Sequence, residues 1–419
     1  AHERSNRALN KALSEPQVYN MNVSNNSTTL IFDPAWGGHH LDYVAKLTRG
    51  LLEIGERPVL YLGRGVRDTR EFDVHLSDAV EQCEVRDTLT PYSGSQPDFR
   101  RTARELRDVV IESDADRVYV PYGDGLIQTV SMMSLLGRRV IPKGVEAEVL
   151  TLRAPFAYPL PWPRRIRGLA GLALLRLSCP WTVVHHLDPL GLRVARRGGS
   201  LLARVSRLMP EPVEPESYPS RDEARQWLGF SSADRLFVCA GGINKRKGVH
   251  LLLDAFRRFA RQNNEGSLLL AGKADRNLEA PLTDLRRELG SRLLALDRYV
   301  SDKEFRMAIA AADVVVVPYP RHVGSSGLLV RAAAAGRYVL ASDWGWIGWA
   351  TREHGLGTTC DVEDPAGLAE ALRDASEHTI HYTQPAAARE FIDFHTLANF
   401  VAHWTADIRC DQEPFTGKA

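Results

Sequence analysis

The stretch RLFVCAGGINKRKGVHLLLDAF, from Arg235 to Phe256, determines the fold expected for the second half of this chain. It predicts a β-strand over 236–240, a turn at Gly241 and Gly242, the cations Lys245-Arg246-Lys247, and a helix after Gly248. A strand that leads through a glycine turn into a helix exposes unpaired backbone N–H groups where the helix dipole is positive. Such a place suits an anion, above all a phosphate. A solvated basic cluster is the alternative, but the strand–glycine–helix context favours the phosphate site.

Length and composition predict an ordinary soluble globular chain with two domains. A chain of 419 residues exceeds what one hydrophobic core usually supports, and 44% of its residues are hydrophobic and 25% charged. The formal net charge of +1 argues against a nucleic-acid partner. Five scattered cysteines without a Cys-x-x-Cys pair predict reduced thiols in the cytoplasm, and neither a zinc site nor disulfides. The sequence shows no signal-peptide h-region and no apolar run long enough to span a bilayer.

Strands and helices alternate twice along the chain, which predicts an α/β fold with a parallel sheet in each of two domains. Residues 1–28, rich in Asn and Ser, are expected to be a flexible leader. Rossmann-like domains are expected over 29–212 and 213–385, joined by a proline-rich connection in Met209–Ser220. Residues 386–419 are expected to be a helical region that packs on either domain, followed by a tail. Parallel sheets of this kind bind ligands at the carboxyl ends of their strands.

The C-terminal half contains five segments in a characteristic order: GGINKRKGVHLLLDAF, LLLAG, YVSDKEFRMAIAAADVVVVPY, HVGSSGLLVRAAAAGRYVLASDWG and GLGTTCDVEDPAGLAEAL. In order and spacing they resemble the GT-B-fold glycosyltransferases of family 4, the glycosyl transferases group 1. The resemblance implies two Rossmann-like domains facing across a cleft, and transfer of a sugar to an acceptor with retention of configuration. It also implies a nucleotide-diphosphate sugar as donor substrate, without a cofactor or a metal ion.

The resemblance assigns a catalytic role to Lys247, which matches the family lysine that meets the donor diphosphate. A point cation there stabilises charge on the leaving group. Gly242 stands where the family has a partner arginine, so Lys245 or Arg246 is expected to supply that charge, although Arg246 equally suits a solvated position. The residues expected to contact the donor are Gly38, Gly241, Gly242, Asn244, Lys245, Val300, His322, Gly324, Ser325, Ser326, Gly327 and Arg331.

The chain departs from the family at the donor loop, which in the family carries Glu-x7-Glu. The matching positions hold Val323 and Arg331, and neither can accept hydrogen bonds as a carboxylate does. Backbone and hydroxyl donors of Gly324–Gly327 are expected to meet a phosphate at the following helix start, and His322 to reach the sugar. The missing acidic pair leaves a second hypothesis open: a relative that binds a sugar nucleotide or a partner without catalysis.

In the N-terminal half, Gly37-Gly38-His39-His40 resembles the family's glycine loop after the first strand. The family often has a histidine near the reacting carbon, and its counterpart here is His185 or His186 in WTVVHHLD. We take His40 and His186 as further candidate catalytic residues. Asp124, in PYGDG after another strand, is expected to bind an acceptor hydroxyl, and the acceptor is expected to be a saccharide or a lipid-linked molecule.

The segment Pro155–Leu177 (PFAYPLPWPRRIRGLAGLALLRL) combines aromatic residues, clustered arginines and a short apolar run. Such a segment suits peripheral contact with the inner face of a membrane, or admission of a lipid-linked acceptor. A core helix with a charged start explains the same pattern, and of the two we favour the core helix. The Asp-x-Asp at Asp114 and Asp116 is expected to cap a strand rather than to hold a metal.

Overall fold

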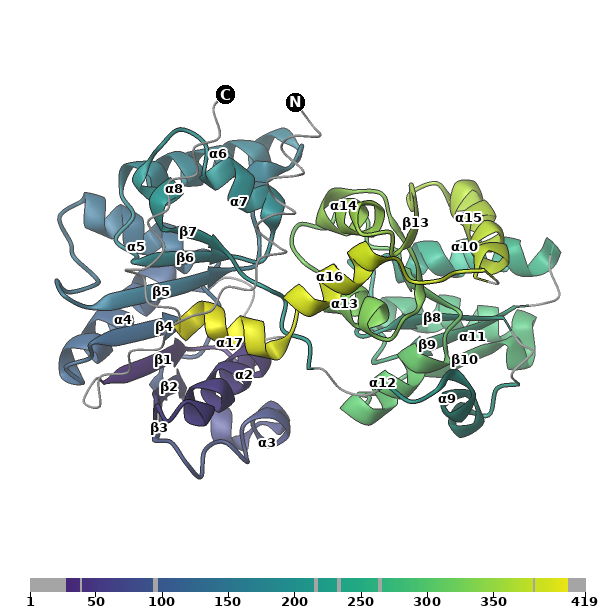
Figure 1. Cartoon of the computed structure of the whole chain (residues 1–419), viewed down its shortest axis with the longest axis horizontal. Coiled ribbons are helices and arrows are strands. Elements are labelled where there is room, and N and C mark those ends of the chain that lie inside the picture. Colours follow the sequence, from purple (N-terminus) through teal and green to yellow (C-terminus); the bar gives the residue numbers. More distant parts are fainter. Residues whose placement is uncertain are drawn as a thin grey trace. The chain divides into compact units, whose positions relative to one another are not determined.

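The computed structural model describes residues 28–37, 40–92, 97–214, 218–231, 235–262, 266–379 and 381–405 (Figure 1). The predicted leader therefore lies outside the described residues, apart from Thr28. The described chain forms two compact units. The N-unit contains the described residues up to Pro212 and those from Leu397 onwards. The C-unit contains Val213–Thr396.

In the described residues, the N-unit contains a seven-stranded sheet in the order β3-β2-β1-β4-β5-β6-β7, with every neighbouring pair parallel. The order reverses between β1 and β4, which is where parallel sheets of this type bind ligands. Its elements are β1 Thr29–Asp33, α2 His40–Glu53, β2 Val59–Gly63, η1 Val66–Asp68, α3 Arg70–His75, β3 Val85–Leu89, α4 Phe99–Glu112, β4 Arg117–Val120, α5 Leu126–Leu135, β5 Glu146–Thr151, η2 Pro155–Ala157, α6 Trp162–Leu177, β6 Val183–His186, α7 Pro189–Ala195, α8 Leu201–Val205, β7 Ser206–Leu208 and α17 Leu397–Thr405.

The C-unit contains, in the part of the chain that is described, a six-stranded parallel sheet in the order β10-β9-β8-β11-β12-β13. Here the order reverses between β8 and β11. Its elements are α9 Arg221–Leu228, β8 Leu236–Ala240, α10 Val249–Gln262, β9 Ser267–Ala271, α11 Arg276–Leu289, η3 Gly290–Arg292, β10 Leu293–Leu296, α12 Asp302–Ala311, β11 Val314–Val317, α13 Gly327–Ala334, β12 Tyr338–Ser342, α14 Gly345–Glu353, β13 Gly357–Cys360, α15 Pro365–His378 and α16 Ala386–Phe394. The expected pair of Rossmann-like parallel sheets is confirmed.

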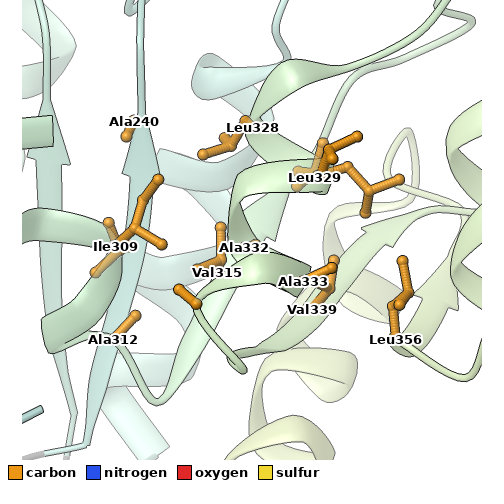
Figure 2. Close-up of a cluster of buried hydrophobic side chains, with 14 of the residues drawn as sticks. Ala240, Ile309, Ala312, Val315, Leu328, Leu329, Ala332, Ala333, Val339 and Leu356 are labelled. Atoms are coloured by element: carbon orange, nitrogen blue, oxygen red, sulfur yellow. The ribbon is translucent and has the colours of Figure 1, made fainter. Parts of the chain in front are cut away.

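The C-unit sheet is covered by helices on both faces, which explains its continuous apolar strands. Along β11, Val315 and Val317 pack with α12, α13 and α14, whereas Val314 and Val316 pack with α10, α11 and α15. Figure 2 shows Leu328, Leu329, Ala332 and Ala333 of α13 turned towards sheet residues that include Val315 and Val339. This packing fixes the start of α13 just beyond the carboxyl end of β11.

The C-terminal region was expected to pack on either one of the two domains. It instead forms two helices, α16 and α17, and each packs on a different unit. In α16, Phe391 packs in the C-unit core with Trp346, whereas in α17 Phe400 and Trp404 are buried in the N-unit. The close approach of α17 to α2 requires a glycine at position 50, where a Cβ would lie 2.2 Å from a methyl carbon of Val401. His395 and Thr396 separate the two helices. Thr396 forms a β-bridge with Val213, so the first and last residues of the C-unit are paired.

Candidate functional site

The segment that follows β8 has the predicted strand–glycine–helix form, and two glycines make it possible. Gly241 and Gly248 have φ values of +96° and +71°, which side-chain-bearing residues adopt only with strain. A Cβ on Gly248 would lie 1.8 Å from the carbonyl oxygen of Pro318, which follows β11. The start of α10 is therefore held directly against the end of the neighbouring strand.

Three backbone amides at the entry to α10 already have partners within the loop, so fewer are available there than the sequence led us to expect. Asn244 folds the loop, because its Oδ1 accepts from the amide of Lys247 at 2.9 Å and its carbonyl oxygen accepts from Val249 at 3.3 Å. The amide of Gly248 donates to the carbonyl oxygen of Lys245 at 3.0 Å. Asn244 thus shapes the loop, and its predicted contact with the donor stays a prediction.

Lys247 is the cation that the loop holds in place. Its side chain is half-buried and folds over Gly241, where a Cβ would lie 2.4 Å from the lysine Nζ. The same Nζ lies 5.5 Å from the ring centroid of Tyr319, a cation–π contact with a residue that the sequence analysis had not singled out. No carboxylate among the described residues forms an ion pair with Lys247. Lys245 and Arg246, by contrast, are exposed.

The start of α13, which follows the adjacent strand β11, also offers unpaired backbone amides. Gly324, with φ +112°, turns the chain into the helix, and the Ser326 Oγ accepts from the amide of Leu329 at 3.4 Å. Within the described part of the chain, the amides of Gly327 and Leu328 have no hydrogen-bond partner. Helix starts with unpaired amides attract anions. The contact of this segment with a phosphate stays a prediction.

Tyr319 links the two helix starts, since His322 also contacts its ring. The two ring centroids lie 5.4 Å apart with the planes at 78°, and His322 Nε2 is 3.1 Å from the carbonyl oxygen of Ser325. A carbonyl oxygen only accepts, so Nε2 carries the proton. The structure thus brings Lys247, His322 and the α13 amides together at the β8–β11 switch point.

Two predicted donor contacts lie against α12 instead. The guanidinium of Arg331 sits 5.2 Å from the ring centroid of Phe305, which is in the first turns of that helix. Val300, just before α12, packs against the C-unit core. Their roles in donor binding stay predictions.

In the N-unit, His40 pairs with a buried carboxylate at the end of β1. Its Nδ1 lies 2.9 Å from both carboxylate oxygens of Asp33, which is 1% exposed. The imidazole stacks on Tyr122 at a centroid distance of 3.8 Å. Because a carboxylate only accepts hydrogen bonds, Nδ1 carries a proton, and Nε2 is the ring nitrogen left for another partner. Gly38 and His39, its predicted neighbours in the glycine loop, lie outside the described residues.

Asp124, beyond the end of β4, is a second carboxylate at this edge. Its Oδ1 accepts from the amides of Leu152 and Arg153 at 3.0 and 3.3 Å, which ties it to the end of β5. Burial raises the pKa of Asp124 to about 6, against the opposing effects of Arg153 and of the two amides. Its Oδ2 is buried and has no hydrogen-bond partner in the described structure, and the Arg153 Nε lies 3.8 Å from it. An oxygen of this kind suits the predicted contact with an acceptor hydroxyl.

His186 occupies a structural position, which argues against its predicted catalytic role. It is 3% exposed, and its ring nitrogens lie 3.1 Å from Thr151 Oγ1 and 3.1 Å from Ser206 Oγ. Burial lowers the pKa of His186 to about 3, so the ring stays neutral. The alternative, His185, is equally buried and lies 2.7 Å from Glu148 through Nε2. The two side chains lie on opposite faces of the sheet and both are buried, which the doublet alone could not reveal.

No group of three or more His, Cys, Asp or Glu residues in the described ranges is arranged to hold a metal ion. Among the helices of the same ranges, none has the length and apolar character needed to cross a membrane.

Comparison with known proteins agrees with this geometry. Residues 234–378 match the family model of glycosyl transferases group 1. Over 218 residues the chain is 26% identical to the D-inositol 3-phosphate glycosyltransferase of Corynebacterium urealyticum, an alignment that covers 46% of this chain and 51% of that protein. The chain therefore spans about half the length of this curated relative.

Two solved structures show the fold over almost the whole chain. The sucrose-phosphate synthase of Thermosynechococcus elongatus superposes with a TM-score of 0.65 at 17% identity, covering 91% of this chain and 96% of that one. Anabaena Alr3699/HepE in complex with UDP superposes with a TM-score of 0.60 at 16% identity and the same coverage. The fold of this chain is GT-B.

Proposed function

We propose that this chain is a glycosyltransferase that moves a sugar from a nucleotide-diphosphate sugar to an acceptor, with the donor bound by the C-unit. The observation that carries the proposal is Lys247, a half-buried cation without a carboxylate partner among the described residues, held beside Gly241 and Tyr319. Two findings support it: the group 1 family model matches this unit, and a protein of the same fold, Anabaena Alr3699/HepE, binds UDP.

In the proposed reaction the bond between the sugar and the nucleotide diphosphate breaks, and a bond from the acceptor oxygen to the same carbon forms. The acceptor proton passes to the departing diphosphate, so the protein has to stabilise charge and hold both substrates rather than provide a strong base. Lys247 and the amides of Gly327 and Leu328 are the groups available for that charge. Retention of configuration and membership of family 4 are part of this proposal, on the strength of the sequence resemblance.

The remaining contacts follow from the placement of polar groups. His322 is next to the position where the family has the first glutamate of its pair. We therefore propose that His322 contacts the sugar of the donor. In the N-unit, Asp124 Oδ2 and His40 Nε2 are assigned to acceptor hydroxyls. The acceptor is a saccharide or a lipid-linked molecule, and the cytoplasmic location predicted from the cysteine pattern is retained as a proposal.

Substitution of Lys247 by alanine tests this assignment. Removing a charged donor from a developing anion costs roughly 3 kcal/mol, so we expect Lys247→Ala to lower sugar transfer by about two orders of magnitude. Lys273→Ala is the matched control, because Lys273 lies in the loop after β9 but is paired with Asp297 at 3.3 Å. Near-normal turnover by Lys247→Ala, or an equal loss in both variants, contradicts the proposal.

A binding protein without catalysis is the second candidate, favoured by Val323 and Arg331 at the positions of the family's two glutamates. Incubation of the purified chain with UDP-, GDP- and ADP-sugars, followed by thermal stability and hydrolysis, separates the two. Stabilisation with slow hydrolysis supports the transferase. Stabilisation without turnover, even after addition of acceptors, supports the binding protein.

A further inference from the structure

Helix α6 of the N-unit carries an apolar face that the described protein leaves exposed. Trp162, Ile166, Leu169 and Leu177 have exposed fractions of 72%, 45%, 47% and 75%. At about 100° per residue these four positions, with the exposed Ala170 and Ala173 between them, fall on one side of the helix. A contiguous apolar stripe of this length on a surface helix marks an interaction site.

The opposite side of α6 is the one that packs on the sheet. Leu172 and Leu175 are buried there, and two glycines allow close approach. A Cβ on Gly168 would lie 3.0 Å from the backbone nitrogen of Phe156, and one on Gly171 would lie 2.5 Å from Gln128 Nε2. The helix therefore cannot turn its exposed face inwards. The core-helix interpretation that we favoured from the sequence holds for one face only.

The charge around this stripe is strongly one-sided. Residues 149–210 contain ten arginines, no lysine and a single acidic residue, Asp188. Asp188 is 1% exposed and accepts a hydrogen bond from the Tyr158 hydroxyl, so it does not offset the surface charge. Arg164, Arg165 and Arg167 are exposed on α6 itself, and none of them has a carboxylate partner in the described ranges.

A second helix extends the same surface. α8 packs beside α6, as Figure 1 shows. It adds Leu201, which is 51% exposed, and the exposed Arg204, with Arg197 in the loop before it.

We propose that α6 and α8 form a docking surface for an anionic lipid membrane. Such a surface combines apolar residues that enter the boundary between head groups and acyl chains with arginines that meet lipid phosphates. Tryptophan is suited to that boundary, because its ring is apolar and its N–H finds polar partners. A second copy of the chain fits less well, because two identical faces would bring their arginine clusters together.

The position of α6 connects this surface with the candidate acceptor site, although lipid binding itself does not depend on the proposed sugar transfer. Ten residues separate the end of β5 from the start of the helix, and the first two of them are Leu152 and Arg153, whose amides hold Asp124. The segment between β5 and α6 therefore joins the surface to the loop that holds Asp124, which suits an acceptor presented from a membrane.

Sedimentation of the purified full chain with vesicles tests the proposal. We expect the chain to bind vesicles of phosphatidylcholine with 30% phosphatidylglycerol, and to bind pure phosphatidylcholine weakly. Trp162→Ser/Ile166→Ser/Leu169→Ser is expected to lower partitioning at least tenfold. Arg164→Gln/Arg165→Gln/Arg167→Gln is expected to lower it by about fivefold per arginine at low salt, and raised salt is expected to have a similar effect on the wild type.

Matched controls use residues of the same kinds elsewhere in the N-unit. Val74 and Ile111 are each 55% exposed and lie off the stripe, so Val74→Ser/Ile111→Ser should bind as the wild type does. The exposed Arg100, Arg104 and Arg107 of α4 provide a second control, with the same loss of charge as the α6 arginine variant. Circular dichroism verifies that every variant is folded.

Three outcomes overturn the proposal. One is equal partitioning of the wild type and the apolar variant, and another is a loss of binding of the same size in the α4 control. The third is a dimer in sedimentation velocity that the apolar variant converts to a monomer, because the face is then an interface between copies. Each outcome is independent of nucleotide binding by the C-unit, so failure here leaves the proposed transfer activity untouched.

Discussion

Replacement of Gly248 by alanine tests the junction that positions Lys247. Gly248 ends the loop after β8, and its backbone contacts the carbonyl oxygen of Pro318 and the ring of Pro320 at the end of β11. A Cβ there would lie 1.8 Å from that oxygen and 2.9 Å from the Pro320 Cδ. Ordinary van der Waals contacts begin at about 3.4 Å, so the start of α10 has to move away from β11.

Two separable costs set the size of the effect. Holding an alanine at φ +71°, in the left-handed region, costs about 1 kcal/mol of folding free energy. Relief of the overlap against backbone atoms adds about 2 kcal/mol, as overpacking of a close-packed interior does. We therefore expect Gly248→Ala to lower the free energy of unfolding of the C-unit by about 3 kcal/mol.

Gly336 provides the matched control within the same unit. Its φ is +67°, close to that of Gly248, but nothing lies within 4 Å of a Cβ built on it. Gly336→Ala therefore carries the backbone cost alone, about 1 kcal/mol. Hydrogen exchange followed by mass spectrometry in a urea series measures both variants, because peptides from β8 and β11 report the unfolding of the C-unit separately.

The same experiment extends to the site. Displacement of the α10 start moves Lys247 away from Gly241, so Gly248→Ala is also expected to weaken the stabilisation that a nucleotide sugar gives, whereas Gly336→Ala is not. The reasoning is refuted if the two variants have the same stability, because the contact with Pro318 would then carry no cost.

Two further predictions concern the N-unit. Because burial raises the pKa of Asp124 from 3.8 to about 6, the native state holds its proton more tightly than the unfolded state does, and stability falls by about 2 kcal/mol as pH rises from 4 to 6. Asp124→Asn keeps an oxygen for the amides of Leu152 and Arg153, so in urea titrations it should exceed the wild type in stability above pH 6 and lose that advantage below pH 4. His186→Ala strands the hydroxyls of Thr151 and Ser206 and is expected to cost about 2–4 kcal/mol, yet to leave the transfer rate per folded molecule within a few-fold of normal. A hundredfold loss of rate in fully folded His186→Ala would restore the catalytic assignment.

Much of the fold could be predicted because its signals are local. The run Val314–Val317 is buried on both faces, as its continuous apolar character indicated. The proline-rich connection in Met209–Ser220 contains the point, between Pro212 and Val213, where one unit gives way to the other. Strand β5 escaped prediction, because Glu146 and Glu148 interrupt its apolar character. Glu148 is acceptable in the core only because His185 of the neighbouring strand lies 2.7 Å away.

The candidate site was less predictable, because its decisive features are pairings across the sheet. Asp33 and His40 are separated by a loop, and only the turn of the chain after β1 brings them within 2.9 Å of each other. The role of Tyr319 could not be predicted from the sequence, because its ring contacts Lys247 and His322 only through the pairing of strands β8 and β11. The amides at the α10 start were expected to be free, but those of Lys247, Gly248 and Val249 donate to the Asn244 side chain and to loop carbonyl oxygens.

By themselves, the residues along this chain determined its two α/β units, the glycine turn at Gly241 and Gly242, and the position of Lys247 between that turn and the following helix. Apolar periodicity and glycine backbone freedom act over a few neighbouring residues, so they can be recognised without the rest of the chain. Only the tertiary structure decided which polar groups are free. It buried His186 with two hydroxyl partners, left Asp124 Oδ2 without one, and chose which apolar face of α6 meets the sheet. Those outcomes depend on the order of strands and on glycines that permit close contact, and both are set by residues far apart in sequence.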